Sequence, residues 1–127
     1  LRAVFHFDEP ACVVTKHMNP CGAAVHADGP EAAFLLALSA DPVSAYGGIV
    51  CFNREVDGET ARSMRKSRTF FEVVAAPGFT AEARDLLSAK EKLRVMELPK
   101  DWAKERPGGT DARRCRRSCV VVHKSAL

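Results

Sequence analysis

The stretch ACVVTKHMNPCGAAV, residues 11–25, decides the fold because it sets two apolar runs around one polar break. Residues 11–15 are short, apolar and β-branched, a pattern that is typical of a buried strand. The Asn-Pro step at 19–20 and Gly22 are turn-forming, so we expect a sharp turn there. Residues 23–25 then predict a second short strand.

Downstream of this stretch, strand patterns alternate with helix patterns. Pro30 suits the first turn of a helix that Asp28 caps, and Thr80 caps a later helix. Because helices of this length separate the strands, we predict the α/β class with a mostly parallel sheet covered on both faces. The expected helices cover residues 30–40, 58–67 and 81–89, and the further expected strands cover 48–52, 72–76 and 93–98.

Composition limits the class of protein. The 127 residues suffice for one domain with a core, and 46% hydrophobic with 28% charged residues is ordinary for a globular protein. No apolar run approaches the ~20 residues that cross a bilayer, and the N-terminal residues lack the pattern of a secretion signal. We therefore expect a cytoplasmic protein with no membrane partner, whose five scattered cysteines stay reduced.

Charge is distributed unevenly along the chain. Residues 1–99 carry 11 Lys/Arg and 13 Asp/Glu, whereas residues 100–127 carry 8 and 3. We therefore divide the chain into a body, 1–99, and a divergent basic tail, 100–127, with the run RRCRR at 113–117.

Three interpretations of the tail stay open: a lineage-specific ending, an aberrant end that comes from a frameshift or truncation, and a basic arm for nucleic acid; a tail that is disordered or aberrant is expected. We favour the aberrant end. We expect no nucleic-acid partner, because the body is net acidic and the basic run lacks interleaved aromatic residues.

Lys16 and His17 are the first candidates for a functional site. They stand where the first strand is expected to end, and ligands of open parallel sheets bind outside the carboxyl ends of strands. Two other loops are rich in turn residues, 44–48 before one strand and 77–79 after another. Loops at opposite strand ends can line one mouth only if their connections fold over, so this pattern alone leaves the site incomplete. A Lys-His pair taken alone is most often a solvated loop.

Three motifs in one order resemble the AICAR transformylase/IMP cyclohydrolase family: KHMNPCG at 16–22, DPVSAYGGIVCFNREVD at 41–57 and FFEVVAAPGF at 70–79. The resemblance covers about residues 10–98. It implies a three-layer α/β/α cytidine-deaminase-like sandwich, here an incomplete domain in which 1–99 form the N-terminal half of the transformylase domain. The cyclohydrolase domain and the second transformylase half are absent from this sequence.

The resemblance also implies an activity: formyl transfer from the co-substrate 10-formyltetrahydrofolate to the 5-amino group of AICAR, in a homodimer without a metal. A weakly nucleophilic amine needs a base, and the formyl group needs a cation or donor. Lys16 and His17 match the family's catalytic pair, and the residues matched to substrate binding are Asn19, Ser44, Gly47 and Glu72. Turn chemistry explains Ser44 and Gly47 equally well, and an exposed strand edge explains Glu72.

Cys21 follows a proline, as in the zinc deaminases, whose signature continues P-C-x-x-C. Here the second thiol is missing, so we expect no metal site. Two alternatives from other classes stay open: a non-catalytic nucleotide-binding or interaction module of the same fold, and a hydrolase with Cys21 as its nucleophile. We further expect the 127-residue chain to be inactive or nearly so by itself.

Overall fold

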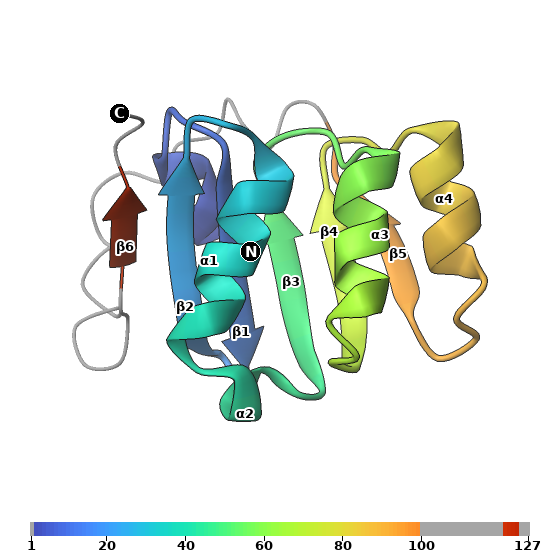
Figure 1. Ribbon diagram of the computed structural model, residues 1–127, viewed down its shortest axis with the longest axis horizontal. Coiled ribbons are helices and arrows are strands. Elements are labelled where there is room, and N and C mark those ends of the chain that lie inside the picture. The colour runs from blue at the N-terminus through green and yellow to red at the C-terminus, as the bar shows by residue number, and fades with distance from the viewer. Residues whose placement is uncertain (1, 100–120, 125–127) are drawn as a thin grey trace.

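The computed structural model describes residues 2–99 and 121–124, which form one six-stranded sheet with helices packed on it (Figure 1). The strand order is β5-β4-β3-β1-β2-β6. The strands are β1 (Ala11–Lys16), β2 (Asn19–His26), β3 (Gly48–Phe52), β4 (Phe71–Ala76), β5 (Arg94–Glu97) and β6 (Val121–Lys124). The helices are α1 (Pro30–Ala40), α2 (Pro42–Ala45), α3 (Gly58–Lys66), α4 (Ala81–Ser88) and the 3₁₀ helix η1 (Arg2–His6).

Strand direction confirms the predicted mostly parallel α/β class. β3, β4 and β5 pair in parallel, and β2 pairs in parallel with β6. β1 pairs antiparallel with both of its neighbours, β2 and β3, so it is the one described strand that runs against the rest. Of the tail at 100–127, only β6 falls within the described residues. The three interpretations of the tail concern the remaining residues, which lie outside the described part of the chain.

The turn that joins β1 to β2 is not where the sequence pattern placed it. Lys16 pairs with Asn19, and the two residues between them, His17 and Met18, have φ of 51° and 67°. Two left-handed residues in a two-residue loop are the geometry of the tight hairpin turn that matches strand twist. The prediction of a turn at 19–22 is therefore wrong. The Asn-Pro step lies inside β2.

A β-bulge makes room for that proline. Val14 pairs with Gly22 and Thr15 with Pro20, which leaves Cys21 as the extra residue on β2. Because proline lacks the N–H that a regular ladder needs, a bulge is one of the few strand positions that tolerates it.

Alternating side chains of the strands build two cores on opposite faces of the sheet. On one face, α1, α3 and α4 cover the strands (Figure 1), and Phe34 of α1 contacts the rings of Phe52 and Phe71 at centroid distances of 6.4 and 5.9 Å. On the other face, Val4 of η1 packs with Val13 and its neighbours. Within the described residues, η1 is the only helix that covers this second face.

Helix starts depend on side-chain caps that the sequence predicted in part. Thr80 caps α4 as expected, accepting a hydrogen bond from the Ala83 N–H at 3.2 Å. The predicted cap at Asp28 is wrong, because α1 begins at Pro30 and its N-cap is Gly29, which has φ 126° and makes no side-chain cap. The short helix α2 was not expected. Asp41 caps it by accepting from the Ser44 N–H at 3.1 Å.

Candidate functional site

The candidate residues gather at one edge of the sheet because β1 is reversed. The carboxyl end of β1 lies beside the amino ends of β3 and β4, since β1 pairs antiparallel with β3 and β4 runs parallel to β3. Ligands were expected outside the carboxyl ends of the strands, and of the strands at this site only β1 has its carboxyl end there. Residues 77–79 follow the other end of β4, where they line a separate hollow with Glu55 and Glu97.

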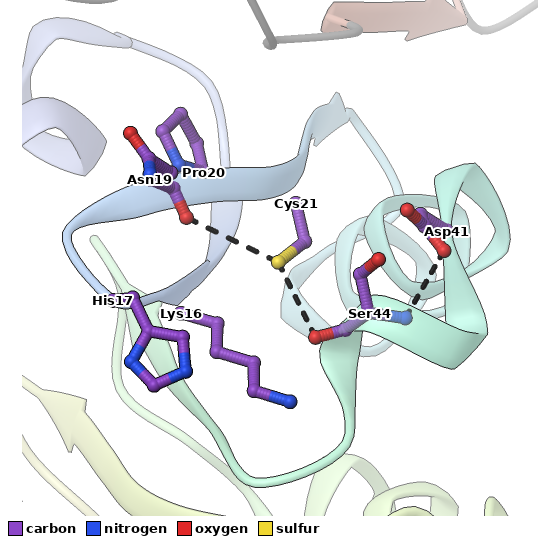
Figure 2. A pocket seen from close by; sticks show the side chains of 7 residues that line it. All are labelled: Lys16, His17, Asn19, Pro20, Cys21, Asp41 and Ser44. Carbon is purple, nitrogen blue, oxygen red and sulfur yellow. Dashed lines mark hydrogen bonds between the residues drawn. The ribbon is translucent and has the colours of Figure 1, made fainter.

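The first pocket has a volume of about 410 Å³ and lies between the hairpin tip and α2. Figure 2 shows the Lys16 side chain between His17 and Ser44, with Asn19 on the opposite side of Cys21 from Ser44. The residues that line it are Lys16, His17, Asn19, Pro20, Cys21, Asp41 and Ser44.

The second pocket, of about 320 Å³, adjoins the first through the two residues that they share. Those shared residues are Lys16 and His17. The second pocket is lined by Thr15, Lys16, His17, Tyr46, Gly47, Ile49, Phe70 and Glu72. The structure therefore brings all six residues singled out in the sequence to two adjoining pockets, Asn19 and Ser44 in the first, Gly47 and Glu72 in the second.

The walls of the second pocket depend on two glycines and a bulge. Gly47 has φ 76°, a left-handed conformation that favours glycine, and its N–H donates to the Phe70 carbonyl oxygen at 2.7 Å. A Cβ at Gly48 would lie 2.8 Å from the Thr15 carbonyl oxygen, so glycine lets the two strands approach. Glu72 is the extra residue of a bulge between β3 and β4, which leaves its exposed side chain at the pocket.

The hairpin tip holds His17 in a left-handed backbone conformation, which residues other than glycine rarely adopt. His17 and Met18 are both left-handed without being glycine, and both are exposed. Such residues persist only where their surroundings impose them, and they cluster at functional sites. The strain lies at one of the two residues shared by the pockets.

Cys21 is a poor candidate for a nucleophile in this setting. Its thiol donates to the Ser44 carbonyl oxygen at 3.5 Å and lies 4.0 Å from the Asn19 carbonyl oxygen (Figure 2). Burial raises the pKa of the Cys21 thiol, the Asp41 carboxylate raises it further, and Lys16 acts in the opposite direction. Since the thiolate is the reactive form, a raised pKa disfavours the Cys21-dependent hydrolase.

Among the lining residues that sequence reasoning did not single out, three carry a charge or an aromatic ring. Asp41 lines the first pocket, and hydrogen bonds from Ser44 lower its pKa, so it carries a negative charge there at neutral pH. Tyr46 and Phe70 line the second pocket with their rings 5.8 Å apart. Each of the three lies within a quoted family motif, but only contact across loops distinguishes them from ordinary turn residues.

Two further features of residues 2–99 and 121–124 concern metal binding and membrane insertion. No group of three or more His, Cys, Asp or Glu side chains in this part of the chain is arranged to hold a metal ion. Over the same residues, no helix has the length and apolar character needed to span a membrane.

Similarity to solved structures supports the fold. Form 1 of Acinetobacter baumannii RibD superposes with a TM-score of 0.59 at 17% identity, over 76% of this chain and 30% of that one. Form 2 gives 0.58 at 18% identity, over 84% and 33%. At this identity the likeness concerns fold alone, and it agrees with the cytidine-deaminase-like sandwich expected from the sequence.

Similarity to curated proteins is closer. The Bifunctional purine biosynthesis protein PurH of Neisseria gonorrhoeae (strain NCCP11945) is 54% identical over 97 residues, and that of Neisseria meningitidis serogroup A is 52% identical over 96. Each alignment covers 76% of this chain and 18% of the relative, so the chain spans under one fifth of the relatives' length. The family model described as AICARFT/IMPCHase bienzyme matches residues 1–126, and the chain belongs to that family.

Proposed function

We propose that this chain contributes Lys16 and His17 to an enzyme of purine biosynthesis that transfers a formyl group from 10-formyltetrahydrofolate to the 5-amino group of AICAR. The observation that carries the proposal is the position of this pair at the border of two pockets. A transfer between two bound substrates needs its acid-base and cationic groups where the two meet. Family membership supports the substrate classes.

The proposed chemistry assigns one task to each residue. The AICAR amine attacks the formyl carbon, a C–N bond forms, and the carbonyl oxygen becomes an oxyanion. His17 accepts the proton that the amine loses, and Lys16 stabilises the oxyanion. The bond between the formyl carbon and N10 of the folate then breaks, N10 takes up a proton, and formyl-AICAR and tetrahydrofolate leave.

The remaining candidates are proposed to bind substrate, and of these Gly47 and Glu72 are proposed to orient the nucleotide. The Glu72 carboxylate suits a ribose hydroxyl or an amide N–H, because an acidic group repels phosphate. Gly47 offers backbone beside it in the second pocket. Asn19 and Ser44 supply amide and hydroxyl groups from the first pocket. As an enzyme we expect a cytoplasmic homodimer, with folate as co-substrate and no metal.

The test joins this chain to the parts that its relatives possess. We would replace the 97 aligned residues of the Neisseria gonorrhoeae protein with the corresponding residues of this chain and assay formyl transfer. We expect turnover, and His17→Ala should lower kcat by about 10² to 10⁴-fold, the range for lost acid-base catalysis. The matched control is His26→Ala, since His26 lies at the far end of β2.

The outcomes separate the proposal from the binding-module alternative. A folded chimera that binds AICAR without turnover, while the unmodified Neisseria protein is active, would exclude formyl transfer and favour a module that binds nucleotide only. Turnover that is insensitive to His17→Ala would overturn the assignment of the base.

A further inference from the structure

Asp41 is a charged residue of the first pocket that the proposed chemistry does not use. Its backbone carbonyl oxygen accepts from the Ala45 N–H at 3.2 Å, and its carboxylate accepts from the Ser44 N–H at 3.1 Å. α2 has only four residues, far fewer than a helix needs to be stable by itself in water. The cap at Asp41 is therefore needed to hold the Ser44 backbone in its helical orientation.

The orientation of Ser44 matters because its carbonyl oxygen accepts from the Cys21 thiol at 3.5 Å. Figure 2 shows the two hydrogen bonds in sequence, one between Asp41 and Ser44 and one between Ser44 and Cys21. Cys21 is the extra residue of the bulge in β2, where the ladder with β1 is interrupted. The thiol thus joins α2 to the hairpin at the place where strand pairing supports the hairpin least.

Lys16 stands at the hairpin end of this chain of contacts. Burial and the Asp41 carboxylate raise the pKa of the Cys21 thiol, and Lys16 lowers it through its charge and through a backbone hydrogen bond to the sulfur. Within residues 2–99 and 121–124, the ion pairs do not include one between Asp41 and Lys16. Asp41 therefore reaches Lys16 through Ser44 and Cys21, and not by direct contact.

Resting on the proposed function, we propose that Asp41 is a positioning residue for formyl transfer, which holds the Lys16 ammonium at the border of the two pockets. It acts by capping α2, so that the Ser44 carbonyl stays in place for the Cys21 thiol. A cation that stabilises an oxyanion must be in place before the negative charge develops, and a displacement of about 1 Å can cost roughly 10²-fold in rate.

The test compares the loss of two helix caps in the chimera with the Neisseria gonorrhoeae protein. Asp41→Ala removes the cap of α2. The matched control, Asp57→Ala, removes the cap of α3, where the Asp57 carboxylate accepts from the Thr60 N–H at 2.8 Å outside both pockets. We expect kcat to fall at least tenfold in Asp41→Ala and less than twofold in Asp57→Ala. The KM for AICAR should change less than twofold in both, because neither cap holds a residue proposed to orient the nucleotide.

Two further variants separate the cap from the charge and test the path. Asparagine caps helices about as well as aspartate, so Asp41→Asn keeps the cap without the charge and should retain at least half of kcat. Cys21→Ala removes the thiol and should lower kcat at least threefold. The double variant Asp41→Ala/Cys21→Ala should be no slower than Asp41→Ala, because both substitutions break the same path. Circular dichroism verifies that each variant is folded.

Three outcomes overturn the proposal. A loss of kcat in Asp57→Ala as large as in Asp41→Ala would show that any lost cap has this effect. A loss in Asp41→Asn as large as in Asp41→Ala would assign the effect to the charge and not to the cap. Losses that multiply in the double variant would show that Asp41 and Cys21 act independently.

The proposed function and this inference fail in different ways. Turnover with kcat unchanged in Asp41→Ala would leave the function supported and the positioning role excluded. If the chimera has no turnover, amide hydrogen exchange in the 127-residue chain still tests the contact path: Asp41→Ala should speed exchange of the Lys16 N–H at least tenfold, and Asp57→Ala should not. That result would leave the path to Lys16 supported and formyl transfer excluded.

Discussion

At the scale of single residues, Met18 combines a side chain that is 94% exposed with a backbone that methionine rarely adopts. A left-handed conformation costs a non-glycine residue about 1 kcal/mol or more, and this side chain loses no burial when it is removed. Met18→Gly should therefore raise the free energy of unfolding by about 1 kcal/mol, measured by urea denaturation.

Met18→Ala is the matched control for that prediction. It removes the same exposed side chain but keeps a Cβ and the strained conformation, so stability should change by less than about 0.5 kcal/mol. If both variants stabilise the chain equally, exposure of the methionine side chain, and not the backbone, is the source of the effect.

Cys21 gives a prediction about reactivity and pH. Because its pKa is raised, less of it is thiolate near neutral pH than in an unstructured peptide. Alkylation by iodoacetamide at pH 7 should therefore be slower than in a peptide of the same local sequence, with the pH midpoint shifted upward. Cys115→Ser and Cys119→Ser would remove the tail thiols from the assay, while Cys12 and Cys51 are buried.

Two substitutions test which neighbouring charges raise and lower the pKa of the Cys21 thiol. Asp41→Asn removes a charge that raises the Cys21 pKa, so alkylation should become faster, whereas Lys16→Ala should make it slower. Faster alkylation in Lys16→Ala would contradict the electrostatic description of the first pocket.

At the scale of elements, Gly22 determines how closely β2 packs under α1. A Cβ at this position would lie 2.1 Å from the Ala37 carbonyl oxygen, a backbone atom that cannot move without shifting the helix. Gly22→Ala should lower the free energy of unfolding by roughly 2 kcal/mol or more, as overpacking does. Denaturation with urea measures it.

Gly78→Ala is the control for steric crowding. A Cβ there would meet the flexible Glu55 side chain at 3.6 Å, which is ordinary contact, so stability should change little. A loss at Gly22 no larger than at Gly78 would show that α1 can shift away from β2.

The elements also show what a sequence pattern can and cannot predict. Apolar runs placed the strands around Val13, Val50 and Val74 correctly, because burial alone produces those runs. The hairpin turn was misplaced because Pro20 is a strong local turn signal, yet pairing across β1 and the bulge at Cys21 override it. A local turn signal fails to predict the structure where pairing between strands compensates for the residue that disfavours a strand.

At the scale of the whole molecule, the strand order predicts a gradient of stability. β1 and β3 are central and paired on both sides, whereas β5 is, among the described strands, an edge strand paired only with β4. Amide hydrogen exchange followed by NMR should show Val14 and Val50 exchanging only through global unfolding, and Val95 exchanging at least about 100-fold faster through local opening. Equal protection at the three positions would mean that the sheet opens as one unit.

The candidate site was predictable as a set of residues but not as a shape. The motifs indicated six positions, yet loops that precede strands and loops that follow strands were not expected to line the same pocket. Strand direction resolves this, because β1 runs against β3. Direction depends on contacts between distant segments, which no local pattern reports. For the same reason the sequence did not reveal that Tyr46 and Phe70 line the second pocket together.

The reversed strand has a further consequence for engineering the chain. The two pockets that Lys16 and His17 border lie at one edge, so foreign sequence inserted at the opposite edge would lie away from both pockets. The exposed Ala27–Asp28 turn leaves β2 at that far edge, and exposed loop tips tolerate insertion best. A fluorescent reporter or an affinity peptide inserted there would follow the folded chain through purification and titration without obstructing the pockets.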